Sequence, residues 1–328
     1  MRISAYCSSL LACLSVLAAP FPAWAQKSAE EYPSKPVRVV VPFAPGASSD
    51  IIARLLGQKL AEAWGQQFIV DNRPGAGGAV GAETVARAAA DGYTLLIENP
   101  GPGLNNILLR RKPTYTFSDF APVLYIGSAP LIAVANPRFP PNDMKELVAY
   151  AKAHPGKVSW GSSGTGSNPH SALETLKAVA GIDIVHVPYK GTAPALTDAV
   201  AGQIDGLFTT TISADAFIRS GRAKVLGVAG PRRQAVIPGV PTFAEQGITG
   251  ADNLLWIGLV TTAKVQRPIV EKLNRELNRI LRTPDVKQRF DQLGMDMEGG
   301  TPEHFERFIA GQADAMRALV KRGALQLE

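Results

Sequence analysis

The chain has 328 residues, with 34 Lys and Arg against 28 Asp and Glu and a formal net charge of +6. The basic residues are scattered, and only residues 110–112 and 232–233 form small clusters, which argues against nucleic-acid binding because that function needs a basic stripe or patch. Both cysteines, Cys7 and Cys13, lie near the start. The rest of the chain therefore offers no disulfide, no cysteine metal site and no thiol nucleophile.

The first 25 residues have the pattern of a secretion signal. Residues 10–19 (LLACLSVLAA) form a short apolar core, and Ala-Trp-Ala at 23–25 is a small-residue cleavage site. We therefore predict export and a mature chain of 303 residues, which is more than one hydrophobic core usually holds, so two domains are expected. Residues 10–13 also resemble a lipoprotein cleavage box, which leaves lipidation of Cys13 open.

Strands and helices alternate downstream of this signal. Strands are predicted at residues 37–41, 68–70 and 94–97, and helices at residues 49–64 and 79–89. A turn-rich loop at 71–78 opens the second helix. Successive strand–helix units predict a parallel sheet with right-handed crossovers.

A second alternating set begins after Pro130. Its predicted strands are residues 131–135, 157–160, 184–187, 205–208 and 225–228, and its predicted helices are residues 142–153, 168–180, 193–201 and 213–220. A run rich in Pro and Gly follows, and then come a strand at 254–261 and helices at 266–281, 284–293 and 302–322. The fold class predicted by this order is α/β.

The two sets predict two similar lobes. The chain is expected to cross between them twice, near residues 126–130 and 253–257. Lobe 1 would then contain residues 33–128 together with 253–328, and lobe 2 would contain residues 129–252. Two crossings act as a hinge, and the C-terminal edges of the strands in both lobes would face a shared cleft.

Two strand-to-helix loops carry the main functional signal. They are residues 42–50 (PFAPGASSD) and residues 161–170 (GSSGTGSNPH). Each loop brings hydroxyl side chains and free backbone N–H groups to a helix N-terminus, where the helix dipole attracts anions. Two such loops suggest two half-sites that close on one small anionic ligand. The alternative is that each loop is only a capped turn.

Three further segments are expected at the rim of the cleft. Tyr189 and Lys190 offer a ring face and a cation, although Lys190 could equally be solvated. Thr209 and Thr210 end another strand of lobe 2, and Glu98 ends a strand of lobe 1. If Glu98 faces the ligand, it disfavours a second carboxylate and favours a monocarboxylate or an amine-bearing acid. The alternative is a solvated loop carboxylate.

The sequence offers little for catalysis. The four histidines lack metal-ligand spacing, and the glycines of residues 161–166 form neither a nucleophile elbow, a P-loop nor a dinucleotide fingerprint. We therefore expect no enzyme activity, no cofactor and no metal. The alternative is a secreted serine hydrolase that uses Ser163 or Ser167 with His170.

Long motifs through nearly the whole mature chain resemble a known family. They include PFAPGASSD, DNRPGAGGAVGAE, GKVSWGSSGTGSNPH, HVPYKGTAPALTDAVAGQID and PGVPTFAEQG. On these motifs the chain resembles the substrate-binding receptors of tripartite tricarboxylate transporters, the Bug family of periplasmic solute-binding proteins. The resemblance implies a type II-like Venus-flytrap fold, location in the periplasm, and capture of a small organic acid for integral membrane transporter subunits. We expect a monomer. The alternative is a ligand-presenting sensor subunit of a two-component system.

The resemblance also implies where the ligand is held, because receptors of this family bind a carboxylate with the loop after the first strand and with the Gly/Ser loop of lobe 2. The predicted ligand-binding residues are Phe43, Ala44, Pro45, Gly46, Ala47, Ser48, Asp50, Glu98, Ser162, Gly164, Thr165, Gly166, Ser167, His170, Tyr189, Lys190, Gly191, Thr209 and Thr210. Three positions depart from the family pattern. Ala47 stands where Gly is frequent, Glu98 opens a stretch where a histidine is common, and Thr209 replaces a frequent aspartate.

Overall fold

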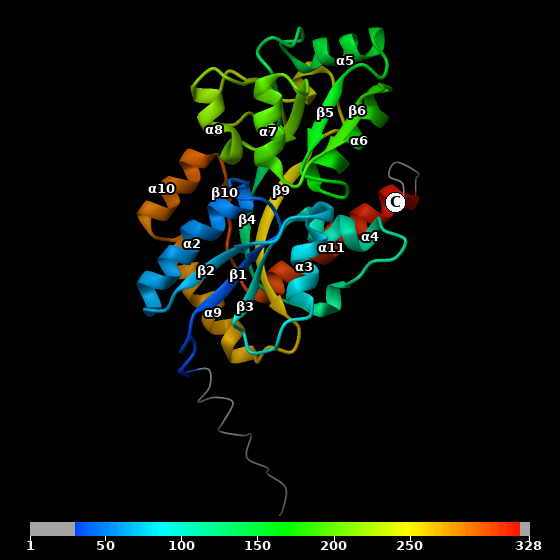
Figure 1. The fold of residues 1–328 in the computed structure, drawn as a ribbon. Coiled ribbons are helices and arrows are strands. Elements are labelled where there is room, and N and C mark those ends of the chain that lie inside the picture. The colour runs from blue at the N-terminus through cyan, green and yellow to red at the C-terminus, as the bar shows by residue number, and fades with distance from the viewer. Residues whose placement is uncertain (1–29, 322–328) are drawn as a thin grey trace, which may run out of the picture.

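The computed structural model describes residues 30–321, and the predicted signal segment with Cys13 lies outside this range. Its strands are β1 (Val37–Val41), β2 (Phe68–Asn72), β3 (Thr94–Glu98), β4 (Phe120–Ala135), β5 (Ser159–Ser162), β6 (Val185–Pro188), β7 (Gly206–Thr209), β8 (Lys224–Ala229), β9 (Leu254–Thr262) and β10 (Asp296–Met297). They follow the hydrogen-bonded order β2-β1-β3-β9-β4-β7-β5-β6, and β8 and β10 both pair with β4. Figure 1 shows β4 and β9 in the middle of the molecule, with one lobe on either side.

The helices connect these strands and cover their faces. They are α2 (Ser48–Trp64), α3 (Ala79–Ala86), α4 (Asn106–Leu108), α5 (Met144–Ala153), α6 (Asn168–Ala180), α7 (Thr192–Ala201), α8 (Thr211–Arg219), α9 (Arg267–Leu281), α10 (Pro284–Leu293) and α11 (Pro302–Lys321). Short helical turns lie at η1 (Ala76–Gly78), η2 (Gly101–Asn105), η3 (Phe117–Asp119) and η4 (Ala244–Gln246). In the described part of the chain, no helix is long and apolar enough to cross a membrane.

Lobe 1 is built on β2, β1, β3, β9 and the first part of β4. Strand β1 is parallel to both β2 and β3, which confirms the parallel arrangement predicted for the first three strands. The run VRVVV suits this central position, because a parallel sheet is covered on both faces and favours β-branched residues. Strand β9 adds to β3 in the antiparallel direction.

Lobe 2 is built on the second part of β4 with β7, β5, β6 and β8. Strand β5 is parallel to β6 and β7, whereas β4 is antiparallel to β7 and to β8. In both lobes, therefore, a strand end leads directly into a helix at the edge that faces the other lobe. The starts of α2 and α6 lie at these two edges, and Figure 1 shows α6 on the side of lobe 2 that faces lobe 1.

A single strand, β4, joins the two lobes. Its residues 120–130 pair with β9, and its residues 131–135 pair with β7 and β8. The register shifts between Tyr125 and Gly127, and a Cβ at Gly127 would collide with the backbone carbonyl of Asp296 in β10. The glycine therefore lets β10 pair at this bend. The chain returns near Asn253, whose N–H donates to the carbonyl of Ala229 while Leu131 N–H donates to the Asn253 carbonyl.

The lobe 1 sheet has two differently covered faces. On one face, α2 packs against α9, and the periodic apolar residues Leu273, Leu277 and Ile280 of α9 are buried in the larger core. On the other face, α3 and α11 cover β3, β4 and β9 through a separate core that includes Trp256 and Phe305. Figure 1 shows α3, α4 and α11 together on this side of the sheet. The terminal helices thus complete lobe 1.

Candidate functional site

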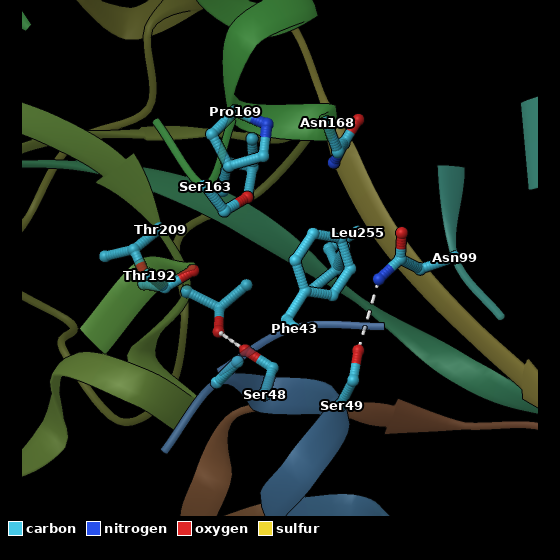
Figure 2. Close-up of a pocket in the computed structure, with 13 residues that line it drawn as sticks. Phe43, Ser48, Ser49, Asn99, Ser163, Asn168, Pro169, Thr192, Thr209 and Leu255 are labelled. Atoms are coloured by element: carbon cyan, nitrogen blue, oxygen red, sulfur yellow. Dashed lines mark hydrogen bonds between the residues drawn. The ribbon is translucent and has the colours of Figure 1, made fainter. Parts of the chain in front are cut away.

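A cavity lies where the two lobes meet. Its lining residues are Phe43, Ala47, Ser48, Ser49, Asn99, Leu131, Ser163, Asn168, Pro169, Thr192, Thr209, Thr210 and Leu255. The residues come from the starts of α2, α6 and α7, from the ends of β3 and β7, and from β4 and β9 where the chain crosses between the lobes. Figure 2 shows the ring of Phe43 near the middle of this group, with hydroxyl and amide side chains around it.

The lobe 1 side of the cavity is the start of α2. Gly46 has φ +85°, a left-handed conformation that favours glycine, and its N–H donates to Asp50 Oδ2 at 3.0 Å. Asn72 Nδ2 donates to the Phe43 carbonyl and to Asp50 Oδ1, both at 3.0 Å. This network holds the loop so that Ser48 and Ser49 reach the cavity at the positive end of the α2 dipole.

Asp50 supports this loop and does not line the cavity in this closed structure, where its predicted contact with the ligand is not met. Its carboxylate is saturated by Gly46, Asn72 and Arg54, and Arg54 Nε donates to Asp50 Oδ2 at 3.1 Å. Burial alone would raise the pKa of Asp50, but the hydrogen bonds from Arg54, Gly46 and Asn72 lower it below its ordinary value. The carboxylate therefore stays ionised and rigid beneath the helix start.

A buried amide extends the site along lobe 1. Asn99 directly follows β3, and its Nδ2 donates to Ser49 Oγ at 3.1 Å, as Figure 2 shows. Its Oδ1 accepts from the N–H of Gly101 at 3.0 Å, which fixes the orientation of the amide. Asn99 and Ser49 thus form a preorganised polar pair at the cavity wall.

Lobe 2 contributes the start of α6 and the end of β7. Asn168 and Pro169 lie at the N-terminus of α6, where Pro169 occupies the first turn and needs no hydrogen-bond partner for its nitrogen, and Ser163 lies in the loop between β5 and α6. Thr209 and Thr210 complete the wall. All of the residues that line the cavity are uncharged at neutral pH. Hydroxyls, amides and the N-termini of two helices make an environment that suits an anion without a cationic side chain.

The two lobes are in direct contact around this cavity. Ser48 Oγ lies 2.8 Å from Thr210 Oγ1 and 2.9 Å from Ser213 Oγ, so hydroxyls of α2 hydrogen-bond to the start of α8. Nearby, a Cβ at Gly77 would collide with the carbonyl of Thr165 in the other lobe. The cavity has a volume of about 20 Å³. Because one water needs about 10–15 Å³ on this measure, the conformation is a closed one.

Five of the predicted ligand contacts line the cavity: Phe43, Ala47, Ser48, Thr209 and Thr210. Ser49 of loop 42–50 also lines it, although it is not among the predicted contacts, whereas the remaining residues of this loop do not, and Pro45 and Gly46 are exposed. Ala44 lies against lobe 2, since a Cβ at Gly191 would come within 2.8 Å of Ala44 Cβ. Gly191 and Ala44 thus form part of the interlobe contact.

Most of loop 161–170 also packs between the lobes outside the cavity. Thr165 and Gly166 pack against Gly77 and Asn106 of lobe 1, and Gly164 approaches Gly77 N closely. Ser167 is fully buried, and its Oγ has no hydrogen-bond partner among the described residues. The predicted roles of Gly164, Thr165, Gly166 and Ser167 as cavity-lining residues are therefore not met in this closed conformation.

Two histidines stack behind this loop. The rings of His170 and His186 lie 4.1 Å apart, and His186 Nε2 lies 2.6 Å from Ser162 Oγ. Burial, His170 and Lys177 lower the pKa of His186 to about 4, so its imidazole is neutral at neutral pH. Ser162 is buried outside the cavity lining. The serine–histidine contact in this loop therefore orders the loop and presents no nucleophile to the cavity.

Tyr189 and Lys190, two further predicted contacts, lie just before α7. Tyr189 Oη donates to Asp198 Oδ2 at 2.8 Å, and burial with this carboxylate raises the pKa of Tyr189 to about 12. Lys190 is exposed, as its solvated alternative anticipates. Neither side chain lines the cavity.

Glu98 does not line the interlobe cavity in this closed structure, where its expected contact with the ligand is not met. Successive residues of a strand point to opposite faces, so Glu98 shares its face with Leu96 and Thr94, whereas the cleft receives Asn99. The Glu98 side chain is 3% exposed and lies in the region of Trp256 and α11. The preference for monocarboxylates inferred from it loses its basis.

The cavity residues missed by sequence reasoning are Ser49, Asn99, Leu131, Ser163, Asn168, Pro169, Thr192 and Leu255. Most of them lie near a strand end or a helix start, and this is the same sequence pattern that predicts Ser48, Thr209 and Thr210. Leu131 and Leu255 differ, because they reach the cavity only through the pairing of β4 and β9 at the crossing. In the described residues, no group of three His, Cys, Asp or Glu could hold a metal ion.

Comparison with known proteins places this geometry in a family. The family model described as "Tripartite tricarboxylate transporter family receptor" matches residues 52–325. The protein BugT of Bordetella pertussis is 32% identical over 321 residues, which cover 97% of this chain and 98% of BugT. The structure of Rpa4515 of R. palustris with adipate matches with a TM-score of 0.85 and 30% identity, covering 88% of this chain and 97% of the other. MatC of Rhodopseudomonas palustris with bound malate matches with a TM-score of 0.84 and 32% identity, covering 88% and 100%.

Proposed function

The chain belongs to the family of tripartite tricarboxylate transporter receptors, and from this premise we propose that it is a periplasmic binding protein, without enzyme activity, that captures a small organic acid and delivers it to integral membrane transporter subunits. The observation that carries the proposal is the cavity at which the N-termini of α2 and α6 converge. MatC with malate and Rpa4515 with adipate support a carboxylate as the ligand.

The chemistry of the cavity fits a carboxylate group. The oxygens of a carboxylate accept hydrogen bonds, and the cavity offers donors from Ser48, Ser49 and Ser163 with the free N–H groups of two helix starts. Phe43, Leu131 and Leu255 supply apolar walls for a carbon chain. Because no cationic side chain lines the cavity, the ligand charge is compensated by helix dipoles and hydrogen bonds. Such a site distinguishes one carboxylate ligand from another by the geometry of its hydrogen-bond donors more than by the net charge of the ligand.

The ligand enters through separation of the lobes. A cavity of about 20 Å³ holds about one water, so even a four-carbon acid requires the lobes to move apart. The hinge lies at the two crossings, within β4 and near Asn253. We place residues 33–128 and 253–328 in one moving body and residues 129–252 in the other. A ligand that touches both bodies favours closure by its higher affinity for the closed form.

Calorimetric titration of the mature protein with malate, adipate and a panel of mono- and tricarboxylates tests the proposal. We expect at least one acid to bind, and Ser48→Ala to weaken it, whereas Thr197→Ala leaves the affinity unchanged. Thr197 is the matched control because its exposed hydroxyl only donates to the Ala193 carbonyl within α7. Equal affinity in both variants, or no binding by any acid, contradicts the proposed site.

Two further measurements separate the alternatives. Turnover of p-nitrophenyl acetate by the wild-type protein would indicate a hydrolase. None is expected from Ser167, which is buried outside the cavity lining, and the assay decides the question for Ser163, which lines the cavity. Pull-down of the membrane subunits from solubilised membranes by the ligand-bound protein would indicate transport, whereas capture of a sensor kinase would indicate the two-component alternative. Light scattering tests the expected monomer.

A further inference from the structure

A second cavity lies in lobe 1, on the face of the sheet opposite the interlobe site. It is lined by Glu98 and Val260 of the sheet, by residues at η3 and the start of β4, and by one side of α11, and its volume is about 400 Å³. Glu98 and Val260 are buried, whereas Ser118, Glu306 and Arg317 are exposed. The cavity therefore runs from a charged mouth to a buried carboxyl group.

Glu98 is unusual because one oxygen of its carboxyl group is buried without compensation. Its side chain is 3% exposed, and Oε2 has no hydrogen-bond partner among the described residues. The side chain fits only because residue 103 is glycine, since a Cβ there would lie 2.9 Å from Glu98 Cδ and 2.8 Å from the Trp256 ring. A buried carboxyl without a partner is costly, and burial raises the pKa of Glu98 to about 8. The cavity therefore contains an acceptor with unused hydrogen-bonding capacity.

Once Glu98 is ionised, as at pH 8.5, the charges around the cavity favour a cation. Two carboxylates, Glu98 and Glu306, then line it against one guanidinium, that of Arg317. Arg317 is engaged elsewhere, because its Nη1 lies 2.8 Å from Asp314 Oδ1. The remaining lining is mainly apolar, with Phe117, Phe120 and Ile309 among its members. The combination is an apolar chamber with an acidic end.

We propose that this cavity is a second ligand site, which takes a small primary amine with an apolar body and binds its ammonium group at Glu98. The ammonium donates hydrogen bonds to the carboxylate, and the apolar body lies against the phenyl rings and the α11 side chains. The site is distinct from the interlobe cavity, because none of the residues that line one lines the other. It is nevertheless one residue away along β3, since Glu98 lines this cavity and Asn99 lines the interlobe cavity.

The probe for this site is the phenethylammonium ion, titrated into the mature protein at pH 8.5. Two molecules with a similar body serve as references: 2-phenylethanol lacks the charge, and 3-phenylpropionate reverses it. We expect phenethylammonium to bind at least tenfold more tightly than 2-phenylethanol, and 3-phenylpropionate to show no binding at this site. Saturation with the carboxylate ligand of the interlobe cavity is expected to leave phenethylammonium bound.

Two variants locate the binding. Glu98→Gln keeps the shape of the side chain, and we expect it to weaken phenethylammonium at least tenfold. Ala310→Phe adds a ring at an exposed position that lines the cavity, so it blocks the mouth without disturbing the core. Ser48→Ala, in the interlobe site, is expected to leave phenethylammonium binding unchanged.

The proposal is overturned by no binding of phenethylammonium at millimolar concentration, by equal affinity in the wild type and in both cavity variants, or by displacement by the interlobe carboxylate. Equal binding of 2-phenylethanol also overturns it, because the buried carboxylate would then not recognise the ammonium group.

Discussion

The hydroxyl of Ser48 in lobe 1 and the hydroxyl of Thr210 in lobe 2 are 2.8 Å apart, so the closed conformation is held by a hydrogen bond between the two helix starts. Both residues line the cavity. The same groups can therefore serve as the interlobe contact and as ligand donors, and a ligand that enters must compete with or rearrange this contact. The residues that hold the two lobes together are thus also residues that can bind the ligand.

Thr210→Val is expected to weaken ligand binding and to favour the open form, because it preserves shape and removes the interlobe hydroxyl. A single hydrogen bond contributes about 0.5–1.5 kcal/mol, so the affinity for malate or a tighter acid should fall roughly two- to tenfold. Calorimetry and small-angle scattering measure the two effects, with Thr197→Ala as the control. An unchanged affinity and radius of gyration would show that this contact is incidental.

Gly77→Ala is expected to prevent full closure. Gly77 has φ +61°, and an added Cβ would meet the carbonyl of Thr165 across the lobes. The matched control is Gly65→Ala, because Gly65 has φ +67° and no atom within 4 Å of its built Cβ. Both variants carry the backbone strain of a left-handed alanine, about 1 kcal/mol, but only Gly77→Ala obstructs the other lobe.

Scattering with saturating ligand separates the two glycine variants. We expect the Gly65→Ala protein to compact on ligand addition as the wild type does, and the Gly77→Ala protein to stay extended with lower affinity. Equal compaction of both variants would show that loop 161–170 yields easily and does not limit closure.

The fold of each lobe follows from local sequence pattern, but the junction does not. The β-branched run of β1 and the apolar period of α9 identify a strand and a helix without tertiary information. The first part of β4 lacks such a pattern, because Pro122, Gly127 and Pro130 interrupt it and its pairing partner β9 lies more than a hundred residues away. Strand β4 is therefore visible only from tertiary contacts.

In the candidate site, too, some residues are predictable from local sequence and others only from the tertiary structure. Ser48 and Thr210 are predictable because a hydroxyl at a strand-to-helix junction is a local signal. Glu98 and Asn99 are adjacent residues whose assignment depends on which face of the sheet each side chain enters. From the sequence we predict Glu98 as the ligand contact. In the structure, Asn99 lines the interlobe cavity and Glu98 lies on the α11 side of the sheet. The place of a residue in the sequence identifies the strand end, but the face of the sheet that its side chain enters depends on how the whole sheet is assembled.

Asp50→Asn is expected to destabilise the protein and to loosen loop 42–50. The carboxylate accepts from Gly46, Asn72 and Arg54, and the substitution replaces one acceptor oxygen with a donor. Since the folded pKa of Asp50 lies below 3.8, its contribution to the free energy of unfolding is complete above that value and is lost as the pH falls through the folded pKa. Thermal melts from pH 3 to 7 should therefore show a wild-type advantage that shrinks toward pH 3. An advantage that is constant over this range would mean that the charge of Asp50 contributes nothing.

Glu98→Gln is expected to remove a specific pH dependence of stability. The folded pKa is raised to about 8 from an ordinary 4.5 by burial, so between these values the folded protein holds a proton that the unfolded chain has released. The free energy of unfolding should therefore fall as the pH rises through this window, by up to about 1.4 kcal/mol per pH unit from this group, and level off above pH 8. The charged or titratable groups that share the surroundings of Glu98 are Tyr115, Glu306 and Arg317.

The measurement is urea denaturation of the wild type and of Glu98→Gln at pH 5, 6, 7, 8 and 9. The variant should gain stability relative to the wild type as the pH rises, because glutamine avoids the buried charge. Burying the new amide changes the stability by the same amount at every pH, so it does not affect how the stability difference between the variant and the wild type varies with pH. Glu306→Gln is the control, because this carboxyl group is exposed at the cavity mouth and its removal should leave the slope unchanged. A stability difference between Glu98→Gln and the wild type that does not vary with pH would mean that Glu98 is ionised in the folded protein and that its carboxylate is compensated.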